Sequence, residues 1–320
     1  MREFQELKDI EQLSRFKNSI IETRVLDEIT FKNRTYPIHS FTIGSNDPEA
    51  PTFGIFGGVH GLERVGTHLA ISYLQNLFTR LTWDDELAGS FNNFRLVSIP
   101  LINPVGMDLI YRSNGNGVDL MRNSPVESFE KTAPLLGGHR YSSKIPWYRG
   151  IEGIIEKENL AVIDFVKKEM FPSKFSMSLD LHSGFGMKDR LWYPYAKTRN
   201  PFPLTAETQN FKNLIDTTLP HHIYLIEQQS QSYTTSGDLW DHLFDLSHDM
   251  KQSNGPFIPW TLELGSWLWV KKNPLQLLSI LGMFNPVRQH RFERVMRRHI
   301  LLFDFFIQAT KNHHNWLEKK

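Results

Sequence analysis

The stretch GGVHGLERVG, residues 57–66, joins an apolar run to a helical pattern. The run before it, TFGIFG at residues 52–57, predicts a buried strand, and the apolar spacing after it predicts a helix over residues 65–81. His60 and Glu63 stand three residues apart in the connecting turn, where an imidazole and a carboxylate can converge on one ion. Glycine lets the backbone bend here without a Cβ clash. Taken alone, the spacing fits a polar turn at a strand end equally well.

A second strand end carries another histidine. In SLDLHSGFG, residues 178–186, the apolar run ends at His182. Ligands of open α/β sheets lie at the carboxyl ends of the strands, so two such ends can share one site. Two neutral imidazoles and one carboxylate suit a catalytic zinc, which keeps its fourth position for water. The residues therefore predict one Zn²⁺ on His60, Glu63 and His182, and three ligands rather than four argue against a purely structural metal.

A third element places a carboxylate inside an apolar strand. Glu263 lies within WTLELG, residues 260–265. A buried carboxylate is costly unless it is paired or functional. Beside a zinc-activated water it would act as general base and then as proton donor to a leaving amine, whereas a structural ion pair is the plainer alternative.

The rest of the chain alternates short apolar runs with longer helical patterns. Further predicted strands cover residues 94–102, 175–181, 223–226 and 258–264, and further predicted helices cover residues 154–171 and 239–250. Such alternation indicates an α/β layered domain with a largely buried sheet. Residues 123–150 are rich in Pro, Gly and Ser without a clear period, which favours a long functional loop over a domain boundary.

The composition limits which binding partners and which cellular compartment are expected. The 36 basic and 35 acidic residues give a net charge of +1, so neither a nucleic acid nor an anionic membrane is expected as partner. The sequence has no cysteine, which excludes disulfides and thiolate zinc ligands. No run approaches the roughly 20 apolar residues that span a bilayer, and the charged N-terminus is unlike a signal peptide. We expect a cytoplasmic enzyme, and we read the basic cluster at residues 288–298 as the solvated face of a late helix.

Together these segments resemble the zinc carboxypeptidases of the funnelin type (the M14 family), from about Arg24 to the helix near Phe306. In that family a His-x-x-Glu pair and a later strand-end His bind zinc, and the catalytic glutamate lies in a strand near the C-terminus. The resemblance thus implies the same metal ligands and assigns catalysis to Glu263. It also implies one catalytic domain over residues 1–320, a mixed and mostly parallel twisted sheet flanked by helices, and a C-terminal helix at about residues 286–310.

INPVGMDLIYRSNGNGVDLMRN, residues 102–123, is similar to another part of the family pattern. The resemblance implies that Arg112 polarises the scissile carbonyl and that Asp119 orients a zinc ligand, His60. It implies that Arg122 holds the terminal carboxylate of the substrate through a bidentate fork. The chain departs from the family at Met121, where an Asn that helps to bind this carboxylate is usual.

SYTTSGDLWDHLFD, residues 232–245, resembles the Tyr-x-x-Ser-Gly loop of the family. Tyr233 would be the mobile phenol that covers the bound substrate, and Asp238 or Trp240 would lie near the pocket for the released residue. The alternative is that Asp238 only caps the following helix.

The resemblance predicts a metallocarboxypeptidase that releases a C-terminal residue from a peptide. The alternative is an N-acyl amino acid deacylase similar to aspartoacylase and succinylglutamate desuccinylase, which share the fold, the His-x-x-Glu pair and the later His, and with which the GGVHGLE stretch is nearly as compatible. Met121 favours the deacylase, whereas the Tyr233 loop and the long span between His182 and Glu263 favour the peptidase. A non-catalytic protein that keeps only the fold is a third reading, against which the intact ligand set and Glu263 argue.

Overall fold

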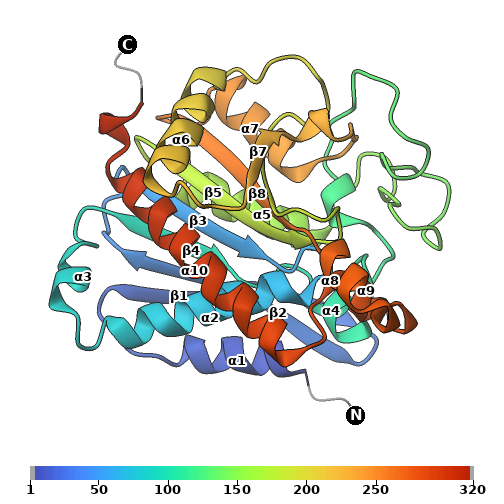
Figure 1. The fold of residues 1–320 in the computed structure, drawn as a ribbon, viewed down its shortest axis with the longest axis horizontal. Helices are drawn as coiled ribbons and strands as arrows, with labels where there is room; N and C mark the ends of the chain where they lie inside the picture. Colours follow the sequence, from blue (N-terminus) through green and yellow to red (C-terminus); the bar gives the residue numbers. More distant parts are fainter. Residues whose placement is uncertain (1–3, 318–320) are drawn as a thin grey trace.

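The computed structural model describes residues 4–317, which form a mixed eight-stranded sheet between two layers of helices (Figure 1). The sheet order is β1-β2-β4-β3-β5-β8-β6-β7. In chain order the strands are β1 (Ile21–Phe31), β2 (Arg34–Gly44), β3 (Thr52–Gly57), β4 (Arg95–Ile99), β5 (Ser176–Ser183), β6 (Arg190–Tyr193), β7 (Leu225–Gln228) and β8 (Phe257–Leu264).

The middle of the sheet is parallel and completely buried. β3 pairs in parallel with β4 and β5, and β5 pairs in parallel with β8. Every residue of these four strands is buried. This explains their continuous apolar character, because helices cover both faces of a parallel sheet. The structure confirms the five strands predicted from the sequence, with β7 beginning two residues later than predicted.

Antiparallel pairs occur towards both edges of the sheet, and the edge strands are partly exposed. β1 and β2 form an antiparallel hairpin with a register shift between Val25 and Asp27, and β6 runs antiparallel to β8. In β1, exposed positions alternate with partly buried ones, so charged residues face solvent along an edge strand. These three strands were absent from the sequence prediction.

The longer helices are α1 (Gln5–Ser14), α2 (Arg64–Arg80), α5 (Lys157–Glu169), α6 (Thr205–Thr218), α7 (Leu239–His248) and α10 (Gln289–Lys311). The shorter ones are α3 (Asp85–Gly89), α4 (Pro104–Leu109), α8 (Trp267–Lys272), α9 (Ile280–Phe284) and the 3₁₀ turns η1 (Leu120–Arg122), η2 (Gln229–Gln231), η3 (Pro274–Leu278) and η4 (His313–Asn315).

Two apolar clusters hold the layers together. One joins α1, α2, α6 and α10 to one face of the sheet, and Phe53 and Ile55 of β3 point into it. The other joins α5 and α7 to the opposite face, and Phe56 of β3 points there. Adjacent residues of one strand therefore supply both cores, as strand geometry requires. In Figure 1, α10 crosses the near face of the sheet diagonally while α5 and α7 lie behind it.

The helix predictions for residues 65–81, 154–171 and 239–250 are confirmed to within three residues at each end. The C-terminal helix begins at Gln289 rather than at about residue 286. Val295 and Met296 of the basic cluster are buried while its arginines face outward, as predicted. Among the described residues, no helix is long and apolar enough to cross a membrane.

Candidate metal centre and catalytic cavity

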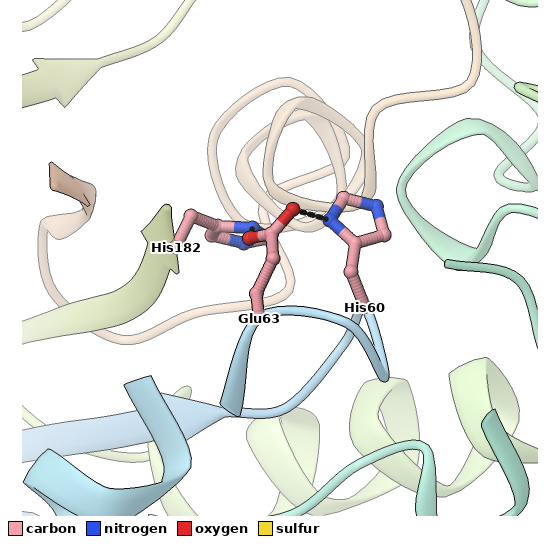
Figure 2. A group of neighbouring side chains, drawn as sticks. All are labelled: His60, Glu63 and His182. Carbon is pink, nitrogen blue, oxygen red and sulfur yellow. Dashed lines mark hydrogen bonds and ion pairs between the residues drawn. The ribbon is translucent and has the colours of Figure 1, made fainter. Parts of the chain in front are cut away.

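Three buried side chains meet where β3 and β5 end (Figure 2). His60 and Glu63 come from the turn between β3 and α2, and His182 comes from the C-terminal end of β5. One ligand atom from each residue can be chosen so that all three lie within 4.8 Å of one another. The structure thus brings together the three residues predicted to bind zinc.

The turn that carries His60 requires a glycine. Gly58 has φ +69°, and a Cβ there would lie 2.6 Å from Oγ1 of Thr67 and 2.7 Å from Cδ1 of Leu101. No other residue type reaches this left-handed conformation as easily, and the space is filled as well. The chain can therefore turn directly from the end of β3 towards the site.

The donor set fits a cation. Nδ1 of His60 lies 2.9 Å from Oε1 of Glu63, and Nδ1 of His182 lies 3.1 Å from Oε2 of the same carboxylate. The opposite nitrogen of each ring faces a second carboxylate, which requires an N–H on Nε2. In the neutral imidazoles that bind metals, both Nδ1 atoms are then acceptors that face a carboxylate acceptor, so a proton or a metal cation has to lie between them. A cation between these three groups resolves the conflict, and two ligands about 2.1 Å from a tetrahedral zinc would be about 3.4 Å apart.

The carboxylates behind the two histidines are Asp119 and Asp180. Nε2 of His60 lies 3.0 Å from Oδ1 of Asp119, and Nε2 of His182 lies 2.6 Å from Oδ2 of Asp180. Both carboxylates are fully buried. Such partners fix the tautomer and the orientation of a metal-binding imidazole. The position of Asp119 agrees with the orienting role that the resemblance implies.

Arg112 joins two of these acidic groups. Its Nε donates to Oδ2 of Asp119 at 2.9 Å, and its Nη1 donates to Oε1 of Glu63 at 3.2 Å. Burial opposes the ionised form of Asp119, but Arg112 and His60 outweigh burial and hold its pKa well below the usual range. Likewise, burial opposes ionisation of Glu63, yet the two histidines keep its pKa below the ordinary value. Both carboxylates are therefore ionised at neutral pH.

Glu263 lies on the strand next to His182. β5 and β8 pair in parallel with His182 opposite Glu263, so sheet spacing alone sets the ligand beside the predicted base. The backbone N–H of Phe185 donates to Oε1 of Glu263 at 2.9 Å. Burial, followed by the negative charge of Glu63, raises the pKa of Glu263 to about 8. This side chain is not neutralised by a structural ion pair among the described residues.

A cavity of about 550 Å³ opens over the three metal-binding candidates. Glu263, Arg112, Arg122 and Tyr233 line it together with these three residues. The loop at residues 123–150 contributes Leu136, Pro146 and Trp147, which supports its prediction as a functional loop. Most of the remaining wall is apolar: Leu62, Met121, Phe185, Trp192, Trp267, Met283 and Phe284.

Arg122 and Tyr233 occupy one wall of this cavity. Nη1 of Arg122 donates to the carbonyl of Met121 at 3.1 Å, which holds the guanidinium at the wall. A Cβ on Gly237 would lie 1.9 Å from the carbonyl oxygen of Arg122, so this glycine lets the two segments touch. The Tyr233 ring lies 5.4 Å from that of Phe185, and burial raises the pKa of its phenol. The catalytic and binding roles of these residues remain predictions.

Asp238 and Trp240 are not among the residues that line the cavity, and their predicted place near the pocket for the released residue stays a prediction. Both are buried under the site. Oδ1 of Asp238 accepts the backbone N–H groups of Trp240 and Asp241 and caps α7, which is the alternative that the sequence offered. Trp240 packs its ring against Phe56, and its Nε1 donates to Oδ2 of Asp180 at 2.7 Å. Helix capping thus occupies one oxygen of Asp238, and core packing holds the ring of Trp240.

Asp180 is the site residue that sequence reasoning missed. Its signal was present, because residues two apart in a strand point to the same face, and Asp180 precedes His182 by two. A second carboxylate on that face of a buried strand indicates a partner for the histidine.

Comparisons with known proteins identify zinc carboxypeptidases as the relatives of this chain. The profile of the zinc carboxypeptidase family (Peptidase_M14) matches residues 20–267. Human carboxypeptidase D is 27% identical over 150 residues, which cover 44% of this chain and 9% of that protein. Carboxypeptidase SOL1 of Arabidopsis thaliana is 22% identical over 229 residues, which cover 71% of this chain and 42% of that protein. The chain therefore spans less than half the length of these curated relatives.

Two solved structures share the fold. Bovine thrombin-activatable fibrinolysis inhibitor, solved with a tick carboxypeptidase inhibitor, superposes with a TM-score of 0.71 at 16% identity and covers 98% of both chains. Carboxypeptidase A from Helicoverpa armigera superposes with a TM-score of 0.67 at 18% identity, covering 94% of this chain and 71% of that one. The predicted α/β fold is thereby confirmed.

Proposed function

The chain belongs to the zinc carboxypeptidase family, and we propose that it removes the C-terminal residue from peptides, with a preference for residues whose side chains are neutral and apolar. The observation that carries the proposal is a single cavity lined by three candidate metal ligands, a buried glutamate and two arginines. This set provides a place for a metal, a proton acceptor and two cationic groups for substrate oxygens.

Each residue has a task in this chemistry. His60, Glu63 and His182 would hold the zinc ion, which when bound would supply a Lewis acid for the attacking water and the amide carbonyl. Glu263, whose ionised form a cation bound beside it would favour, accepts a proton from the attacking water and passes it to the leaving nitrogen as the C–N bond breaks. Arg112 lies on the same wall as Glu63, and its guanidinium offers N–H groups to the carbonyl oxygen as negative charge develops there.

The leaving side of the substrate lies at Arg122 and Tyr233. Arg122 offers a cation for the terminal carboxylate, and the phenol of Tyr233, whose pKa burial raises further above neutral pH, offers a hydrogen bond. Glu63 and Glu263 are the acidic side chains that line the cavity, and both already have tasks in the mechanism. A lysine or arginine on the leaving side would find no further carboxylate. Neighbouring Trp192, Phe185 and Met121 favour an apolar side chain.

Met121 supports a second candidate. It lines the cavity beside Arg122, at the position where the family usually has an Asn that binds the terminal carboxylate. An N-acyl amino acid deacylase needs a different set of contacts for its smaller substrate. The long loops that enclose the cavity, including Leu136 and Trp147, favour the peptidase, because they provide contact area for a substrate larger than one amino acid.

A substrate panel tests the proposal. Zinc-loaded protein is given N-blocked dipeptides that differ only in the last residue (Phe, Leu, Lys or Asp), the same peptides as C-terminal amides, and N-acetyl amino acids. We expect the highest kcat/KM for free-acid peptides ending in Phe or Leu, and little hydrolysis of the amides. Turnover of N-acetyl amino acids without turnover of any peptide would establish the deacylase instead.

The variant Glu263→Gln serves as control for contaminating peptidases, because it removes the proposed proton acceptor and leaves the metal ligands intact. A preference for Lys over Phe at the last position would refute the proposed apolar preference while leaving the carboxypeptidase activity standing.

A further inference from the structure

The segment that follows the catalytic strand projects an unusual set of apolar side chains. Residues 267–287, here called the apolar knob, comprise α8, η3, α9 and the residues around them. Its exposed side chains are Trp267 (57%), Leu275 (71%), Leu277 (55%), Leu278 (87%), Ile280 (62%), Met283 (41%) and Val287 (58%). Single exposed apolar residues are ordinary, but a group of seven in 21 residues marks an interaction site.

The exposure is built into the fold. Gln276 is buried, and its Nε2 donates to the carbonyl of Gly282 at 2.6 Å, which fixes η3 against α9. Asn285 ties the knob to the turn of the metal site: its Nδ2 donates to the carbonyl of Leu62 at 2.8 Å, and its Oδ1 accepts from the N–H of Val65 at 2.9 Å. The apolar side chains are therefore held outward by a fixed scaffold.

The charged residues within this stretch of sequence have one sign. No Asp or Glu occurs between Glu263 and Glu293, whereas Lys271, Lys272 and Arg288 in this interval are exposed. The net charge of +1 for the whole chain conceals this local excess. Apolar side chains bordered by cations, with acidic residues excluded, match the boundary between the acyl chains and the head groups of an anionic bilayer.

We propose that the apolar knob docks this protein on an anionic lipid bilayer. Leu278, at 87% exposure, projects from the surface rather than lining a groove, and a projecting side chain inserts readily into a soft lipid interface. A peptide or a second copy of this chain would need a matching groove or an acidic counterpart. In Figure 1, α9 lies at the margin of the molecule with α8 beside it.

Docking would place the cavity at the lipid surface. Trp267 and Met283 belong both to the exposed knob and to the cavity wall, so the knob adjoins the cavity opening. If the proposed hydrolysis is correct, substrates held at the membrane would meet the site directly. The binding itself does not depend on that function.

Sedimentation with lipid vesicles tests the proposal without any measurement of activity. The full chain is mixed with vesicles of phosphatidylcholine alone or of phosphatidylcholine with phosphatidylglycerol, at low and high salt. We expect binding to the mixed vesicles, weaker binding to phosphatidylcholine alone, and weakening with salt. The double variant Leu278→Ser/Ile280→Ser should bind the mixed vesicles about tenfold or more weakly, because two apolar side chains no longer enter the lipid.

Matched variants separate the apolar contribution to vesicle binding from the electrostatic one. Leu160→Ser/Leu301→Ser changes two exposed leucines on α5 and α10 and should bind as the unchanged protein does. Lys271→Gln/Lys272→Gln should weaken binding to the anionic vesicles only, whereas Lys167→Gln/Lys168→Gln, an exposed pair on α5, should not. Unchanged circular dichroism confirms that each variant folds.

Three results would overturn the proposal. The first is that the unchanged protein fails to sediment with anionic vesicles at low salt, and the second is that the Leu278→Ser/Ile280→Ser variant binds these vesicles as well as the unchanged protein does. The third is that light scattering finds oligomers in the absence of lipid and that this variant dissociates them, because a second copy of the chain would then be the occupant of the knob.

Discussion

Oδ2 of Asp180 lies 2.6 Å from Nε2 of His182, on the same face of β5 and two residues away along the strand. Burial disfavours a charged histidine, but Asp180 and Glu63 together outweigh burial and raise the pKa of His182 well above the usual value. The same carboxylate oxygen accepts a hydrogen bond from Trp240, so strand, helix α7 and candidate ligand are joined at one atom.

Replacing Asp180 by Asn should therefore weaken zinc binding. The amide keeps the shape but loses the charge that orients and strengthens the imidazole, and a loss of about 10- to 100-fold in affinity is expected. Competition with a zinc chelator measures it. Asp164→Asn, on the exposed side of α5, is the matched control. Equal affinity for both variants would remove Asp180 from the site.

Trp240→Phe should affect zinc binding less than Asp180→Asn does. The ring contact with Phe56 is retained, but Asp180 loses the Nε1 donor in a buried place. The unmet hydrogen bond should lower the free energy of unfolding of the metal-free protein by about 1–3 kcal/mol. Urea unfolding measures this change, and an unaltered midpoint would show that the hydrogen bond does not contribute.

Glu263→Gln should abolish turnover and leave zinc bound. The amide oxygen can still accept the Phe185 N–H, so the local structure persists, but the side chain no longer accepts a proton from water. Loss of a general base lowers kcat by about 10²- to 10⁴-fold. Metal analysis and kcat are measured on the same preparation, and full activity of this variant would refute the assignment.

Met121→Asn should improve recognition of a free terminal carboxylate. Met121 lines the cavity next to Arg122, and an amide N–H there adds one hydrogen bond to an ionised group, lowering KM about tenfold. The comparison uses one peptide as free acid and as C-terminal amide. If KM for both forms changed equally, the carboxylate would not lie at this position.

His299 should make stability depend on pH. It is completely buried, its Nδ1 lies 2.9 Å from the Tyr224 hydroxyl, and burial lowers its pKa from 6.5 to about 3. Below pH 6.5 the unfolded chain takes up a proton at this residue and the folded chain does not, so stability falls as pH falls. Between pH 6.5 and pH 5 the loss is about 2 kcal/mol.

The variant His299→Gln should flatten this pH dependence, whereas His221→Gln, at an exposed histidine, should not. Urea unfolding at a series of pH values provides the measurement. The interpretation fails if the two variants follow the same pH curve.

The sequence predicts the parts of this fold whose residues share one environment. TFGIFG reads as a strand because both faces of β3 are buried, and the helix after Glu63 is amphipathic. The sequence does not predict the β1–β2 hairpin, because its exposed face mixes charged residues with partly buried apolar ones and such a pattern also fits a loop. Pairing partners, rather than local preference, decide edge strands of this kind.

The metal site is predictable for a related reason. Strand ends fix the positions of His60 and His182, whatever the surrounding loops do. The direction of Asp238 and Trp240 instead depends on where α7 begins, because a shift of one residue turns each side chain by about 100° around the helix axis. Strand alternation is enough to place Asp180 on the same face as His182. Its role as the partner of this histidine becomes evident only once His182 is recognised as a metal ligand.

The last strand of the sheet has a consequence for the order of synthesis. β8 pairs with β5 on one side and β6 on the other, although it follows both in the chain. A chain emerging from the ribosome therefore holds all three candidate ligands once residue 182 is made, but it lacks the residue proposed to activate water until residue 263 has followed. The same insertion joins β6 and β7 to the rest of the sheet. The residue proposed to activate water and the strand that completes the sheet would thus arrive in one step.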